Sequence, residues 1–210
     1  MSRFYAAIQN ARALVPATGR LPAEPPGLPG AADASDLPVL RLWQAVESRL
    51  PGRRRKVVLI AACADGEADS GIALRLARLA GRIMGGGVVV LNSRPNPSGG
   101  DHGPVAFGPL PGGNGDLRAL NPGLLASYWQ LLLRAADLVI LDAPPVLASP
   151  VCLGLAPTVD GVILLVEAER TRQAVAEAAR DALQACGANL LGVVLNKRRF
   201  AVPAALYRRL

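Results

Sequence analysis

The sequence has few of the side chains that build most metal centres and covalent catalytic sites. Its 210 residues hold one histidine, His102, and three widely spaced cysteines, Cys63, Cys152 and Cys186. We therefore expect neither a metal site nor a disulfide framework, and free thiols fit a reducing compartment. No uninterrupted apolar run reaches the about 18 residues of a membrane-spanning helix, and the N-terminus lacks a signal-peptide pattern. The expected location is the cytoplasm.

Lysine is also scarce, although the chain is basic. Lys56 and Lys197 are its only lysines, yet 23 Lys and Arg residues outnumber 16 acids and give a net charge of +7. Such an excess favours an acidic partner, which is anionic lipid, an acidic protein face or nucleic acid. The basic runs lack the aromatic interleaving that stacks on bases, so nucleic acid is the weakest of these candidates.

Two arginine-rich runs are the candidate interaction patches. One precedes the first expected strand and the other is C-terminal, and together they contain Arg53, Arg54, Arg55, Lys56, Arg198, Arg199, Arg208 and Arg209. Solvated surface charge is the simplest interpretation. The functional alternative is attachment to anionic lipid or to a membrane partner, at about 1 kcal/mol per basic residue near a charged surface.

Hydrophobic patterning divides the chain into three parts. Residues 1–36 are expected to form a short helix and a Pro/Gly-rich linker, residues 37–200 one folded domain, and residues 201–210 a basic tail. Within the domain, short apolar runs alternate with amphipathic helices, which predicts an α/β fold with a doubly wound, mostly parallel sheet flanked by helices. The expected strands are 57–62, 88–92, 105–110, 138–142, 161–167 and 190–196, and the expected helices are 38–50, 71–84, 124–136 and 171–185.

The loop after the first strand occupies the place of a phosphate-binding loop. Gly66 and Ser70 suit that role, but Ala68 and Asp69 stand where glycine and lysine are required. An aspartate beside a triphosphate replaces attraction by repulsion, a change of about 4 kcal/mol in each direction at about 4 Å and an effective dielectric constant of about 20. An acidic turn that caps a helix is the structural alternative.

A second candidate position is Asp142, which ends an apolar run and precedes Pro144 and Pro145. In P-loop proteins such an aspartate positions Mg²⁺ and the attacking nucleophile. A carboxylate that caps a turn is the structural alternative. Trp43 and Trp129 occupy helical apolar positions and are expected in the core, where Cys63 is expected as a small packed residue.

In combination, these segments resemble the cytoplasmic domain of the bacterial tyrosine kinases (BY-kinases) of capsule and exopolysaccharide systems. That family lies in the MinD/ParA-like branch of the P-loop NTPases, so the resemblance implies this fold over roughly residues 36–200. The Walker B motif is matched closely, and the Walker A and A′ motifs are matched in position. The matching segments are 57–71 (Walker A), 88–97 (Walker A′), 108–125, 138–147 (Walker B), 160–166 and 191–196.

The resemblance also implies a degenerate nucleotide site. Asp69 stands for the Walker A lysine, Asn92 and Arg94 stand for two aspartates of Walker A′, and Asp142 is the remaining acid. We expect Arg94 to pair with Asp69 or Asp142 in place of bound Mg·ATP. The degenerate site comprises Gly66, Ala68, Asp69, Ser70, Asn92, Arg94, Asp142 and Asn196. Tyr207 stands alone where the family's kinases end in a tyrosine cluster, and it is the candidate phosphoacceptor.

These departures indicate a pseudokinase that needs no cofactor or metal, because phosphoryl transfer depends on positioned charge. We expect a non-catalytic accessory protein of exopolysaccharide or capsule synthesis and export, peripheral at the inner membrane. Its expected partner is the membrane-embedded polysaccharide co-polymerase (Wzz-type) or another inner-membrane exopolysaccharide protein, and self-association stays open. A divergent active tyrosine autokinase or ATPase using ATP and Mg²⁺ is the first alternative, and a MinD/ParA-like positioning protein is the second.

Overall fold

The computed structural model describes residues 36–64, 71–93 and 105–196. The expected N-terminal helix, nearly all of the linker and the basic tail lie outside these ranges. No described helix combines the length and the apolar character that a membrane crossing requires.

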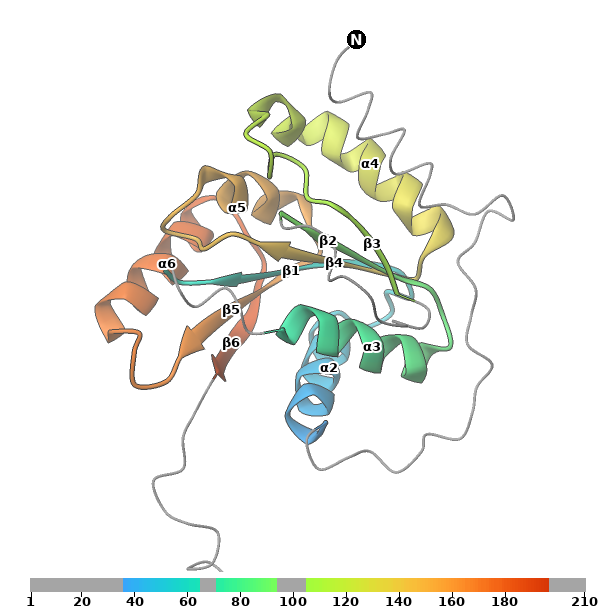
Figure 1. Ribbon diagram of the computed structural model, residues 1–210, viewed down its shortest axis with the longest axis horizontal. Helices are drawn as coiled ribbons and strands as arrows, with labels where there is room; N and C mark the ends of the chain where they lie inside the picture. The colour runs from blue at the N-terminus through green and yellow to red at the C-terminus, as the bar shows by residue number, and fades with distance from the viewer. Residues whose placement is uncertain (1–35, 65–70, 94–104, 197–210) are drawn as a thin grey trace, which may run out of the picture.

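Six strands form one sheet, and each pairs with its neighbours in parallel, in the order β3-β2-β4-β1-β5-β6 (Figure 1). The central strand β1 is buried along its whole length, as a parallel strand covered on both faces must be. The predicted doubly wound parallel sheet is confirmed. The strands are β1 (Lys56–Ala62), β2 (Val88–Asn92), β3 (Val105–Pro109), β4 (Leu138–Ala143), β5 (Gly161–Glu167) and β6 (Leu190–Asn196).

Helices cover both faces of the sheet (Figure 1). On one face lie α2 (Leu37–Arg49) and α3 (Ile72–Met84); on the other lie α4 (Pro122–Ala135), α5 (Pro150–Leu155) and α6 (Gln173–Ala185). Two 3₁₀ turns, η1 (Leu117–Leu120) and η2 (Ala156–Thr158), flank α4 and α5. These layers make the chain an α/β protein with a doubly wound parallel sheet.

Strand alternation divides the core into two clusters. In β1, Val58 and Ile60 pack with α2 and α3, whereas Val57, Leu59 and Ala61 pack with α4, α5 and α6. Trp43 lies in the first cluster and Trp129 in the second, and both are buried. The prediction that both tryptophans are core residues is confirmed.

Helix starts differ from expectation where a side chain caps the backbone. Helix α4 begins at Pro122, two residues early, because the Asn121 side chain accepts hydrogen bonds from the Gly123 and Leu124 N–H groups. Helix α6 begins two residues late, since the Thr171 hydroxyl accepts a hydrogen bond from the Glu167 N–H instead of entering the helix. The six-residue helix α5 was not predicted because it is too short to show a period.

Candidate functional site

The carboxyl ends of the strands define the candidate site. From β1 the chain passes to α3 on one face of the sheet, whereas from the adjacent strand β4 it passes to α5 on the other face (Figure 1). Connections that diverge from neighbouring strands open a crevice at this edge, and doubly wound folds bind ligands there. The topology therefore places the candidate site at the carboxyl ends of β1 and β4.

Asn92 and Asp142 meet at this edge. They are register partners in the parallel pairing of β2 with β4. Both follow the alternation of strand residues that face α3, so they lie side by side on one face of the sheet. Each is half-buried. The structure thus brings together two of the predicted site residues, one carboxylate and one amide.

Asn196 occupies the same edge but not the same position. It pairs in register with Glu167 at the ends of β6 and β5, and β1 and β5 separate it from β4. Glu167 is a polar strand end that the sequence interpretation omitted, and its carboxylate lies 3.6 Å from the Arg170 guanidinium. The pattern that revealed Asp142, a carboxylate at the end of an apolar run, is also present at Glu167.

The Walker A-like and Walker A′-like loops are described only at their ends. The predicted residues Gly66, Ala68, Asp69, Ser70 and Arg94 lie outside the described residues, as does the proposed Arg94 ion pair.

At the near end of the first loop, Cys63 donates from both its N–H and its thiol to the Leu165 carbonyl, and it is buried. This confirms Cys63 as a packed residue. At the far end, Gly71 has φ of 62° and precedes α3 without a side-chain cap. Glycine adopts this left-handed conformation without steric cost.

The described residues do not form a Mg²⁺-nucleotide site. Mg²⁺ takes oxygen ligands in a nearly octahedral arrangement, and the described part of this edge contributes the Asp142 carboxylate and the Asn92 amide. Within residues 36–64, 71–93 and 105–196, no three His, Cys, Asp or Glu side chains gather closely enough to hold a metal ion. No catalytic step follows from these groups.

The first basic run is not a continuous charged surface. Lys56 is buried at the start of β1 and is not part of a charged surface, so its inclusion in the patch was wrong. Arg53 pairs with Asp160, and Arg55 lies 3.5 Å from Asp137. Of the run, Arg54 alone has no ion-pair or hydrogen-bond partner among the described residues.

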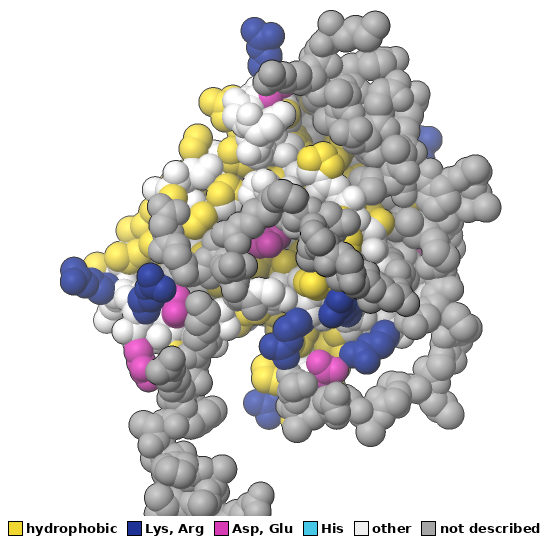
Figure 2. Space-filling model, in the orientation of Figure 1, with side chains coloured by type: hydrophobic (Ala, Val, Ile, Leu, Met, Phe, Trp, Pro, Cys, Tyr) yellow, Lys and Arg dark blue, Asp and Glu magenta, His cyan; other side chains and the backbone are white. Residues whose placement is uncertain are grey.

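The second run, with Arg198, Arg199, Arg208, Arg209 and the candidate phosphoacceptor Tyr207, lies outside the described residues. Exposed arginines also follow the outer side of α3, at Arg75, Arg78 and Arg82. Figure 2 shows Lys and Arg side chains gathered over α2 and α3. The spacing of three and four residues along an otherwise apolar helix was the sequence signal for this second basic surface.

Two titration shifts belong to the core rather than to this edge. Burial raises the pKa of Tyr128 on α4 from 10.0 to about 12. Burial, reinforced by Cys186, raises the pKa of Cys152 on α5 from 9.0 to about 12. Both groups are neutral at physiological pH, so neither supplies a base or nucleophile.

Comparison with known proteins gives the architecture a family context. A tyrosine-protein kinase of Bacillus subtilis, YwqD, is 34% identical over 87 residues, which are 39% of this chain and 37% of that kinase. The kinase domain of the Escherichia coli tyrosine kinase ETK superposes with a TM-score of 0.66 over 84% of this chain and 81% of that chain, at 15% identity. The chain has the fold of a bacterial tyrosine kinase domain, and 87 of its residues are similar in sequence to such a kinase.

A second structure supports this conclusion for the kinase-like domain. The VpsO kinase domain matches with a TM-score of 0.61, 18% identity, and coverage of 77% of this chain and 94% of that chain. No family model matches the sequence. The match to YwqD spans about a third of that relative's length. The similarity therefore does not assign the kinase activity of YwqD to this chain.

Proposed function

We propose that the kinase-like domain acts without phosphoryl transfer, as an accessory protein of bacterial exopolysaccharide or capsule synthesis and export. The observation that carries the proposal is the pairing of Asn92 with Asp142 at the switch point of the sheet. The family resemblance places an aspartate where Asn92 stands. An amide in that position cannot supply the second negative charge that a metal-assisted transfer uses.

The sequence adds two further charge changes in the segments that follow β1 and β2. Asp69 replaces the lysine that would contact the nucleotide phosphates, and Arg94 replaces a second aspartate. Each exchange reverses the sign of the charge offered to Mg·ATP. Because these substitutions oppose Mg·ATP binding, they favour a role in binding a partner protein over a role in catalysis.

The proposed partner is the membrane-embedded polysaccharide co-polymerase, or another inner-membrane exopolysaccharide protein, which holds the domain at the membrane surface. The net charge of +7 and the arginines on α3 favour an acidic surface. Sedimentation with membranes that contain the purified co-polymerase tests this step. Substituting Arg75, Arg78 and Arg82 by Glu should abolish co-sedimentation, whereas charge reversal at Arg118 and Arg180 should leave it intact.

Calorimetric titration tests the absence of catalysis. ATP and ADP, each with and without Mg²⁺, should give no binding heat with the natural chain. The double substitution Asp69→Lys with Ala68→Gly should restore measurable binding, because it returns the phosphate-contacting residue types. Micromolar, Mg²⁺-dependent binding to the natural chain that disappears in Asp142→Ala would contradict the proposal.

A divergent active tyrosine autokinase or ATPase is the second candidate. It is favoured by Asp142, which stands at the end of β4 where the resemblance places the Walker B carboxylate. Incubation with labelled ATP and Mg²⁺ distinguishes the two candidates. An active kinase would label the chain, lose the label in Tyr207→Phe if that residue is the acceptor, and lose all activity in Asp142→Ala.

A further inference from the structure

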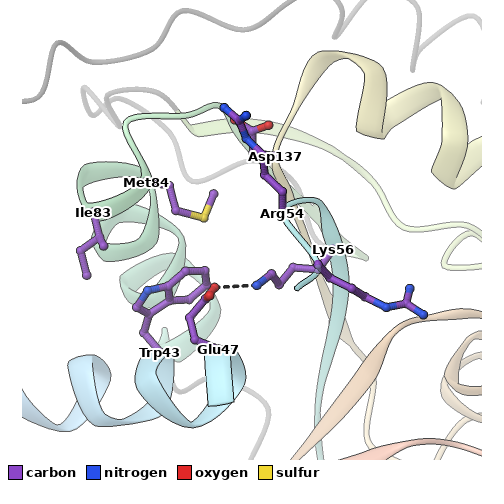
Figure 3. Close-up of a pocket in the computed structure, with 8 residues that line it drawn as sticks. Trp43, Glu47, Arg54, Lys56, Ile83, Met84 and Asp137 are labelled. Atoms are coloured by element: carbon purple, nitrogen blue, oxygen red, sulfur yellow. Dashed lines mark hydrogen bonds and ion pairs between the residues drawn. The ribbon is translucent and has the colours of Figure 1, made fainter. Parts of the chain in front are cut away.

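A pocket of about 370 Å³ lies at the opposite edge of the sheet, beside the amino end of β1 (Figure 3). Helix α2 supplies one wall, the C-terminal turn of α3 a second, and the segment that enters β1 a third. Its lining residues are Trp43, Glu47, Arg53, Arg54, Lys56, Ile83, Met84 and Asp137. The pocket is separate from the nucleotide-like edge, because strands run the length of the sheet between them.

Lys56 is the central polar group of this pocket. Its side chain is 2% exposed, and its ammonium donates to the Glu47 carboxylate at 2.6 Å and lies 5.6 Å from the centroid of the Trp43 ring. An ammonium has three N–H donors, and Glu47 takes one of them. The remaining donors have no acceptor among the described protein groups and are available to an occupant of the pocket.

The charge lining the pocket has an excess of one cation. Three basic side chains face two carboxylates. Arg53 pairs outward with Asp160, and Asp137 is paired by Arg55, which does not line the pocket. Lys56 and Glu47 compensate each other, so the cation left over is Arg54 at the rim. The pocket therefore attracts an anion.

The remaining wall is apolar. Trp43, Ile83 and Met84 present an indole, a branched chain and a thioether to the same space (Figure 3). A volume of about 370 Å³ falls in the range of about 300–1,000 Å³ typical of small-molecule sites. An occupant thus combines an anionic group with an aromatic or apolar group.

We propose that this pocket binds a phosphate monoester with an aromatic or apolar substituent. Arg54 and Lys56 hold the phosphate, and Trp43 with Met84 contacts the substituent. A phosphate has three terminal oxygens, enough to accept from both the Arg54 fork and the free Lys56 donors, whereas a carboxylate has two. The monoester is either a free metabolite or a lipid headgroup, and the same contacts serve both.

Intrinsic fluorescence provides a local reporter, because the chain has two tryptophans on opposite faces of the sheet. Trp129→Phe leaves Trp43 as the reporter in the pocket. In that background, phenyl phosphate should change the Trp43 emission saturably, inorganic phosphate should bind at least fivefold more weakly, and phenol should not bind. Calorimetry on the natural chain should give the same order.

Two substitutions locate the site. Arg54→Ala and Lys56→Met should each weaken phenyl phosphate binding at least tenfold, since each removes a charged donor. The matched control is Arg118→Ala, an exposed arginine on η1 outside the pocket, which should bind as the natural chain does. Arg54 is exposed and has no described partner, so its variant tests the site even if Lys56→Met fails to fold.

Vesicles separate the two sources of the phosphate. Phosphatidylcholine vesicles with phosphatidic acid, compared with phosphatidylcholine alone, test a lipid headgroup by flotation. Flotation that needs phosphatidic acid and is lost in Arg54→Ala assigns a lipid monoester, and its absence beside phenyl phosphate binding assigns a free one. The proposal is overturned if neither probe binds, or if Arg54→Ala and Arg118→Ala bind phenyl phosphate equally.

Discussion

The two edges of the sheet are closed in different ways. At the carboxyl edge, the segment after β4 is tied to the end of β1 by backbone hydrogen bonds, from Val146 N–H to the Ala62 carbonyl at 2.9 Å and from Leu147 N–H to the Cys63 carbonyl at 3.3 Å. At the amino edge, backbone hydrogen bonds, such as that from Lys56 N–H to the Asp137 carbonyl at 3.1 Å, are joined by ion pairs and side-chain hydrogen bonds. Asp160 accepts from the Val57 N–H at 2.8 Å and also pairs with Arg53.

The charged residues that stabilise the fold therefore lie at the amino edge, whereas the nucleotide-site residues named by the family resemblance lie at the carboxyl edge. Backbone hydrogen bonds tolerate side-chain replacement, so the carboxyl edge can exchange charges, as at Asn92, without loss of the fold. The amino edge depends on particular charges, some of them buried with their partners. Substitutions at the amino edge should therefore reduce stability more than substitutions at the carboxyl edge, and the predictions below test this order.

The largest effect is expected for Glu47→Ala. It leaves the ammonium of Lys56, which is 2% exposed, without its carboxylate at 2.6 Å. Removing one partner of a buried pair is costly, and because Glu47 itself is half exposed we expect a loss of about 2–3 kcal/mol. Urea unfolding provides the measurement.

The matched control is Glu177→Ala, an exposed helical glutamate that accepts a hydrogen bond from Gln173. It should change stability by less than about 0.5 kcal/mol. Adding Lys56→Met to Glu47→Ala should recover most of the loss, since no charge then remains buried. Equal losses in Glu47→Ala and Glu177→Ala would remove the distinction between the two edges.

A smaller loss is expected for Gly86→Ala, which probes packing at the same edge. A Cβ on Gly86 would overlap the Asp137 carboxylate and lie 3.1 Å from its Cγ, so this carboxylate, which lies 3.5 Å from Arg55, must shift. Overpacking of this kind costs about 2 kcal/mol. Gly192→Ala on β6 is the control, because its Cβ would meet no atom within 4 Å. A shift in urea midpoint for both variants alike would show that the effect is not local.

Much of the fold was predictable because apolar runs mark buried parallel strands directly. The bounds of β2, β5 and β6 match the predicted strands, whereas the strand order was not predicted. The family resemblance assigned Asn92 and Asp142 to one site, and the structure pairs them in register on β2 and β4. Local pattern suffices for the strands themselves.

The amino edge was not predictable from pattern. Lys56 ends a run of arginines and so suggests solvent exposure, yet Trp43 and Glu47, four residues apart on α2, enclose it. Arg53 finds Asp160 across 107 residues of chain. Such pairs depend on tertiary packing that one sequence does not display. The Arg94 ion pair stays a prediction, since that residue lies outside the described ranges.

Alkaline titration provides a reference from the core, which belongs to neither edge. The Tyr128 hydroxyl is buried without a hydrogen-bond partner among the described residues, and its pKa is raised from 10.0 to about 12. Above pH 10 the unfolded chain releases this proton while the folded chain retains it, so stability is present below pH 10 and is lost as pH rises toward 12.

Tyr128→Phe removes that loss. At neutral pH we expect a change of less than about 0.5 kcal/mol, because the hydroxyl has no hydrogen bond to lose. At pH 11 the variant should be more stable than the natural chain by about 1 kcal/mol. Urea unfolding at both pH values measures this, and Cys152→Ala should flatten the same alkaline decline independently. Parallel pH profiles of the natural chain and Tyr128→Phe would rule out the assignment.

The smallest effect is expected at the carboxyl edge, for Asn92→Asp. The substitution places a second carboxylate opposite Asp142 on neighbouring strands, about 5 Å apart, and both positions are half-buried. Repulsion between like charges in register should cost about 0.5 kcal/mol in the presence of EDTA, and Mg²⁺ should reverse the loss because oxygen ligands of both residues then share a cation. Urea unfolding with EDTA or with Mg²⁺ measures the difference.

In the double variant Asn92→Asp with Asp142→Asn, one carboxylate remains, so both the loss of stability and the Mg²⁺ response should vanish. A Mg²⁺ response that persists in the double variant would place the cation elsewhere, whereas its confinement to the single variant would show that one amide at this strand end separates the present edge from a metal-binding one.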